Sequence, residues 1–122
     1  MQDLMQLLAD IPGLDFKKGL EVFEDDIEDY IAALQSFVKN TPETIKKLRS
    51  FKKENLPEYA INIHGLKSIS AWICAPEIYE GAVELDAFAK AGDVSGIIEK
   101  NGSFLEEAES FLAGIKKILD EV

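Results

Sequence analysis

Apolar side chains recur at intervals of three or four residues along most of this chain, the spacing that gives an α-helix one buried face. The segment from residue 59 to 75 shows this spacing most clearly. One face of it carries large apolar or aromatic side chains, namely Tyr59, Ile63, Leu66, Ile69 and Ile73. The opposite face carries Ala60, His64, Lys67, Ser68, Ala71 and Ala75. The pattern predicts an amphipathic helix that directs the only histidine of the sequence away from the core.

The same spacing predicts helices before this segment. We expect a short N-terminal helix over residues 1–9, with Met1 in its apolar pattern, a helical turn over 16–22 and a helix over 25–39. Thr41-Pro42 has the signature of a new helix start, because an N-cap hydroxyl is followed by proline at the first helical position. A separate helix is therefore predicted from there to about residue 54.

Prolines bound the central helix. Leu56-Pro57 begins it, and Ala75-Pro76 ends it after about Cys74 and begins the next helix, which runs to Ala91. The tripeptide Asn101-Gly102-Ser103 could interrupt the final stretch, yet the apolar spacing continues across it without a shift. We therefore expect one long helix from about residue 93 to 120.

These elements define the fold class, since no segment alternates in the manner of a β-strand. Helices of this length with short connections predict an all-α protein, an antiparallel four-helix bundle with an additional short N-terminal helix on its side or end. A length of 122 residues fits a single domain, residues 1–122.

Charge and composition exclude several classes of function. Thirteen basic against 23 acidic residues give a net charge of −10, which disfavours binding to nucleic acid or to anionic membranes. No apolar run approaches the roughly 20 residues of a membrane span, and the N-terminus lacks the basic start of a secretory signal. Cys74 is the only cysteine, so no intrachain disulfide is possible and a cytoplasmic location is expected.

The surroundings of His64 distinguish it from an incidental histidine. Its neighbours one turn away are Ala60, Ser68 and Ala71, which are too small to shield an imidazole. Gly65 follows it, although glycine inside a helix costs about 1 kcal/mol relative to alanine. A partner backbone could therefore approach closely here.

The sequence lacks the partner residues that most histidine-based reactions require. Cys74 lies nearly three turns from His64 and about 80° around the helix, so a thiolate–imidazole pair is geometrically implausible. A metal site needs several converging ligands, and no glycine-rich phosphate loop is present. What remains is an imidazole nitrogen that receives and passes on a phosphoryl group, with Lys67 one turn further on to stabilise its charge.

The stretch Ile63-His64-Gly65-Leu66-Lys67-Ser68 resembles the His-x-Leu-Lys-Gly core of histidine-containing phosphotransfer (HPt) domains. The likeness extends along most of the chain. It includes Ile11-Pro12-Gly13-Leu14-Asp15 with Gly19-Leu20, then Tyr30, Leu34 and Phe37, and the segment from Leu85-Asp86 to Gly92-Asp93.

This resemblance implies an antiparallel four-helix bundle in which His64 accepts a phosphoryl group from a receiver-domain aspartate and passes it to another receiver. Lys67 matches the family lysine that stabilises phosphohistidine. The expected partner is a response-regulator receiver domain or a hybrid histidine kinase, which brings the Mg²⁺; no metal or cofactor of the chain's own and no independent turnover are expected. The expected docking face comprises Ala60, Ile61, Gly65, Ser68, Ala71 and Ala75.

Two departures from the family pattern leave an alternative open. Ser68 and Cys74 stand where the family has glycines. Cys74 is interpreted as structural, and Trp72 is expected to be partly buried beside the site. The alternative is an adaptor that binds a receiver or kinase without carrying phosphate, and a third interpretation is a helical scaffold with an incidental histidine.

Overall fold

Helices make up all the regular secondary structure in residues 4–121, the part of the chain that the computed structural model describes. In chain order they are α1 (Leu4–Ala9), α2 (Phe16–Val22), α3 (Ile27–Arg49), the short 3₁₀ turn η1 (Lys53–Asn55), α4 (Leu56–Trp72), α5 (Pro76–Ala91) and α6 (Val94–Asp120). The predicted all-α class is confirmed for this range. Met1, which we placed in the N-terminal helix, lies outside the described residues.

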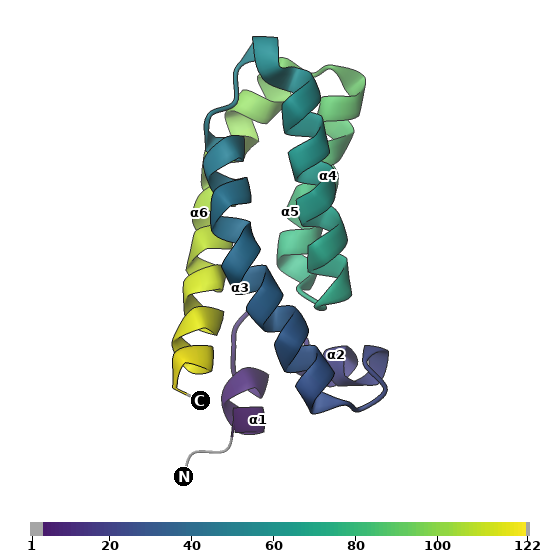
Figure 1. Ribbon diagram of the computed structural model, residues 1–122. Helices are drawn as coiled ribbons and strands as arrows, with labels where there is room; N and C mark the ends of the chain where they lie inside the picture. The colour runs from purple at the N-terminus through teal and green to yellow at the C-terminus, as the bar shows by residue number, and fades with distance from the viewer. Residues whose placement is uncertain (1–3, 122) are drawn as a thin grey trace.

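The four long helices run alongside one another, with α3 beside α6 and α4 beside α5 (Figure 1). The α4–α5 pair is the most extensive contact, and α6 packs against both α3 and α5. The two short helices lie at one end of the molecule, where α1 contacts α6 and α2 contacts α3 (Figure 1). The helix pair α4–α5 therefore forms one side of the molecule.

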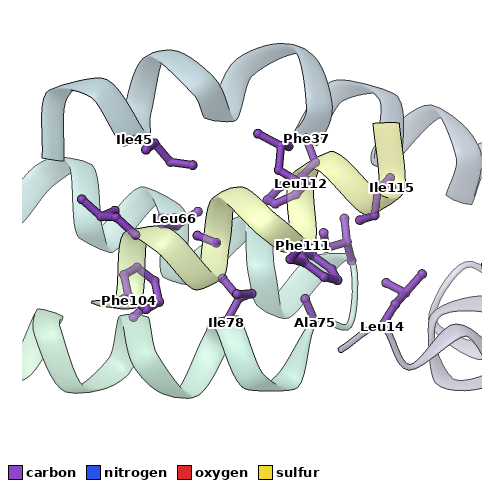
Figure 2. Close-up of a cluster of buried hydrophobic side chains, with 14 of the residues drawn as sticks. Leu14, Phe37, Ile45, Leu66, Ala75, Ile78, Phe104, Phe111, Leu112 and Ile115 are labelled. Carbon is purple, nitrogen blue, oxygen red and sulfur yellow. The ribbon is translucent and has the colours of Figure 1, made fainter. Parts of the chain in front are cut away.

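The core lies between these helices and includes the predicted apolar face of α4. Tyr59, Ile63, Leu66 and Ile73 are buried, whereas Ile69 is partly exposed. Figure 2 shows how side chains of the long helices meet in the interior with residues from the α1–α2 and α4–α5 connections. It labels Leu14, Phe37, Ile45, Leu66, Ala75, Ile78, Phe104, Phe111, Leu112 and Ile115. Burial of this face directs the opposite face of α4 to solvent.

The predicted helix break at Thr41-Pro42 is wrong. One helix, α3, continues through Pro42, with Thr41 buried inside it. Proline within a helix removes a hydrogen bond and costs about 3 kcal/mol. The apolar residues on both sides, Phe37 and Ile45, lie on the same buried face, and a break would have withdrawn one of them from the core. Tertiary packing therefore outweighs the local signal.

The long helix α6 is continuous across Asn101-Gly102-Ser103, as predicted. Asn101 is buried there and joins three helices. Its Nδ2 donates to the Leu48 carbonyl at 2.9 Å, and its Oδ1 accepts from the Tyr59 hydroxyl at 2.8 Å. Burial raises the pKa of Tyr59, so the hydroxyl keeps the proton that it donates. A polar residue inside an apolar stripe thus fixes how α3, α4 and α6 align.

Replacing Asn101 with alanine is expected to lower the free energy of unfolding by about 2 kcal/mol, because the buried Tyr59 hydroxyl loses its partner. Urea denaturation followed by circular dichroism measures the change. Asn40→Ala is the matched control, since Asn40 is exposed and bonds only to Ser36 in the described contacts; it should stay within about 0.5 kcal/mol of wild type. Equal effects at the two positions would contradict the bridging role of Asn101.

Candidate functional site

His64 lies on the solvent face of α4, and its side chain is 57% exposed. Gly65 and Ser68 beside it are also exposed, and a methyl group added at Gly65 would meet nothing within 4 Å. The imidazole is therefore open to a partner, as the helical spacing predicted.

A buried carboxylate lies against this exposed imidazole. Asp86 comes from α5, and only 5% of its side chain is exposed. Its Oδ1 is 3.8 Å from His64 Nδ1, close enough for an ion pair with a protonated ring but too long for a hydrogen bond. Its Oδ2 accepts from Lys67 Nζ at 2.7 Å and lies 2.9 Å from Lys90 Nζ. We call these four residues the Asp86 cluster.

The cluster exists because α4 and α5 pack closely. Asp86 occupies a place in the buried stripe of α5, among Ala82, Leu85 and Ala89. Lys90 follows it by four residues, so it stands one turn further on the same face. Lys67 reaches across from α4, three residues after His64. Each helix thus supplies one lysine to the carboxylate between them.

The electrostatics of the cluster favour a negatively charged ligand. Burial by itself would raise the pKa of Asp86, but the hydrogen bonds from Lys67 and Lys90 outweigh it and hold the pKa of this carboxyl below its ordinary value. Asp86 is therefore ionised at neutral pH. Two ammonium groups against one carboxylate leave a local charge of +1 beside His64, in a chain whose net charge is −10.

The contribution of this ion-paired carboxylate to stability should fall in acid. Because the folded-state pKa of Asp86 lies below the unfolded value of about 3.9, its stabilisation is present above that pH and is lost as the pH falls through the folded pKa. We expect Asp86→Asn to lower the free energy of unfolding by about 1–2 kcal/mol at pH 7 and by much less near pH 2.

Urea denaturation between pH 7 and pH 2 measures this difference. Asp120→Asn is the control, because its ion pair with Lys116 is largely exposed and should contribute less than about 0.5 kcal/mol at either pH. A difference between wild type and Asp86→Asn that does not change with pH would contradict the assignment.

Comparisons of the chain with protein-family models, with curated proteins and with solved structures found no match. The Asp86 cluster and its surroundings are therefore the features that indicate a function. Within residues 4–121, no helix is long and apolar enough to cross a membrane, and no group of three or more His, Cys, Asp or Glu is placed to hold a metal ion.

The structure places most of the expected docking face around His64. Ile61 is 73% exposed, Gly65, Ser68 and Ala71 are exposed, and Ala60 is partly exposed. A groove of about 390 Å³ runs beside this face between α3 and α4, and Ile61 and Gly65 contribute to its lining. The predicted face therefore combines apolar and small side chains next to the imidazole.

Ala75 does not belong to this face, and its assignment was wrong. Helix α4 ends at Trp72, and Ala75 lies in the connection to α5 with its side chain fully buried. The sequence prediction assigned helix faces up to residue 75, three residues past the end of α4. The chain changes direction at Cys74, whose φ of 61° is in the left-handed region, so later residues no longer follow the faces of α4.

The left-handed conformation at Cys74 is one that glycine usually adopts. Glycine adopts a positive φ without steric cost, which is why helices commonly end with it. Here cysteine takes that place, and its side chain is buried. Burial raises the pKa of the Cys74 thiol, which disfavours the reactive thiolate. These features support the structural interpretation of this residue.

Trp72 is more exposed than expected, at 46%. Its ring packs against Phe23 with the ring centroids 5.3 Å apart, so it covers the junction between the end of α4 and the segment after α2. It lies two helical turns from His64 along α4. Its role in the site is therefore peripheral.

Asp86 and Lys90 are the site residues that the sequence analysis missed. Asp86 entered only as part of a family resemblance, and Lys90 was not considered. A signal was present, because an aspartate stands in the apolar stripe of a predicted helix and a lysine follows four residues later. A charged residue at a core position requires a partner, and Lys90 was the nearest one in the sequence.

Proposed function

We propose that this chain is a histidine phosphotransfer protein of the HPt class. The observation that carries the proposal is the exposed imidazole of His64 beside a buried, ionised carboxylate that forms ion pairs with two lysines. The four long helices, on this proposal, form the antiparallel bundle of that family. The proposed partners are receiver domains or hybrid histidine kinases of a two-component phosphorelay, and the proposed location is the cytoplasm.

The position of Asp86 supports different tasks for the two imidazole nitrogens in this proposal. Nδ1 is the nitrogen near the Asp86 carboxylate, and Nε2 is left for the incoming group. The Nε2 lone pair forms a bond to phosphorus, while the phosphorus–oxygen bond of the donor's aspartyl phosphate breaks and its electron pair returns to the donor carboxylate. The proton on Nδ1 stays on the ring, and Asp86 offsets the resulting positive charge.

The cations of the cluster account for charge stabilisation. A phosphoryl group on His64 brings close to two negative charges to the face that Lys67 shares. Phosphoryl transfer depends mainly on positioning and charge neutralisation, so a histidine, a lysine and a partner that supplies the carboxylate and Mg²⁺ are sufficient. The chain itself requires no cofactor in this scheme.

The docking face fits a partner that must approach the imidazole closely. Ile61 offers an apolar contact, and Gly65 leaves open space at the surface beside the ring. The proposed face is Ala60, Ile61, Gly65, Ser68 and Ala71.

Incubation with receiver domains carrying ³²P-labelled aspartyl phosphate tests the proposal. We expect label to move to the chain, with at most one phosphoryl group per molecule, and the product to be labile in acid and stable in alkali, as a phosphoramidate is. The His64→Gln variant should remain unlabelled. Absence of transfer from every receiver in a broad panel, or equal labelling of His64→Gln, would contradict it.

An adaptor that binds a receiver without carrying phosphate is the second candidate. Ser68 favours it, because this exposed side chain adds bulk where the family has glycine. Receiver binding that is unaffected by His64→Ala, together with no transfer to wild type, would support the adaptor.

A further inference from the structure

Two lysines share a single carboxylate oxygen in the Asp86 cluster. Lys67 Nζ lies 2.7 Å and Lys90 Nζ 2.9 Å from Asp86 Oδ2, while Oδ1 remains on the side of His64. One ammonium group is enough to neutralise one carboxylate. The second is therefore surplus in the resting protein, and its presence needs an explanation.

The two lysines are not equivalent in position. Lys67 belongs to α4, on the helix that carries His64, and its side chain is only 22% exposed. Lys90 belongs to α5, on the helix that carries Asp86, and its side chain is 65% exposed. Lys67 therefore lies on the same helix as His64, within reach of a group bound to the imidazole. Lys90 instead lies one turn from Asp86 on the same helix, at the i,i+4 spacing.

We propose that Lys90 is a positioning residue that keeps Asp86 neutralised when Lys67 leaves it to bind the phosphoryl group on His64. The proposal rests on the proposed phosphotransfer function and assigns to the resting ion pairs an exchange of partners. Lys67 moves from the carboxylate to the phosphoryl oxygens, and Lys90 remains on Asp86 Oδ2.

The energetic reason lies in the burial of Asp86. A buried carboxylate that loses its only cation has a large desolvation penalty, which would oppose the departure of Lys67. With Lys90 already in contact, the carboxylate stays ionised and paired throughout. Asp86 then remains available to His64 Nδ1 while Lys67 serves the phosphate.

Phosphoramidate tests this exchange without any partner protein. In this reaction the His64 Nε2–phosphorus bond forms, the phosphorus–nitrogen bond of phosphoramidate breaks and ammonia leaves. Phosphohistidine formation and its half-life are followed by ³¹P NMR on the full chain. We expect Lys90→Met to slow formation or shorten the half-life about fivefold, and Lys90→Arg to restore both to within about twofold of wild type.

A double-mutant cycle separates this role from a structural one. In the Asp86→Asn background no buried charge needs Lys90, so Lys90→Met should change phosphohistidine formation and half-life less than about twofold. Lys100→Met is the matched control, because Lys100 is comparably exposed and pairs with Glu84 on the same helix as Asp86; it should behave as wild type.

Each result is decisive for the exchange. Wild-type behaviour of Lys90→Met, or an equal loss in the Asp86→Asn background, would overturn it. Failure of the proposed function would look different from failure of the exchange. Receivers would then transfer no phosphoryl group to the chain, while with phosphoramidate Lys90→Met would still be slower or less stable than Lys90→Arg and wild type.

Discussion

Replacing Gly19 with alanine is expected to lower the free energy of unfolding by about 3 kcal/mol or more. A Cβ at this position would overlap the Tyr30 ring, at atoms that include Cζ and the hydroxyl oxygen. Tyr30 is fully buried, and its hydroxyl donates to the Ile73 carbonyl at 2.9 Å. The ring therefore cannot retreat without losing that hydrogen bond at the end of α4.

Urea denaturation monitored by the fluorescence of Trp72 measures this change. Gly102→Ala is the matched control, since an added Cβ there meets nothing within 4 Å and Gly102 lies within α6. The control should gain up to about 1 kcal/mol of stability from helix propensity. A Gly19→Ala protein as stable as wild type would show that α2 does not approach Tyr30 as closely as described.

Replacing Gly65 with alanine is expected to affect stability and phosphotransfer in opposite directions. The position is exposed within α4, so alanine should raise the free energy of unfolding by about 0.5–1 kcal/mol. The added methyl group would stand beside His64 at the proposed docking face. A displacement of about 1 Å in the reacting groups can reduce a rate on the order of 10²-fold, and we expect a loss of that size.

The rate of transfer from a phosphorylated receiver is measured beside the unfolding curve. Gly102→Ala again serves as the control, because it should gain similar stability without any change in transfer. Wild-type transfer by Gly65→Ala would exclude close approach of a partner at this position, whatever the effect on stability.

The helices could largely be predicted from the sequence because their apolar spacing is local. The predicted starts at Leu56 and Pro76 coincide with those of α4 and α5. The exception was Pro42, where a local start signal competed with the burial of Phe37 and Ile45 on one continuous face. The sequence spacing cannot show which of the two effects is stronger, because Phe37 and Ile45 pack against side chains of other helices.

The site likewise has one part that could be predicted from the sequence and one part that could not. The exposure of His64 follows from its place on one helix and was predictable. The contact of Asp86 with Lys67 depends on how α5 is aligned with α4, which no spacing within either helix specifies. Ala75 was misplaced because α4 ends before Cys74, where the backbone adopts a left-handed conformation.

The left-handed bend at Cys74 also determines how His64 and Asp86 are aligned with each other. His64 precedes Cys74 by ten positions and Asp86 follows it by twelve, so both are set by counting outward from one bend. Inserting a single amino acid between the bend and Asp86 would turn the acid by about 100° and shift it by about 1.5 Å relative to the imidazole. The number of residues between Cys74 and His64, and between Cys74 and Asp86, must therefore stay constant for the acid to remain beside the ring.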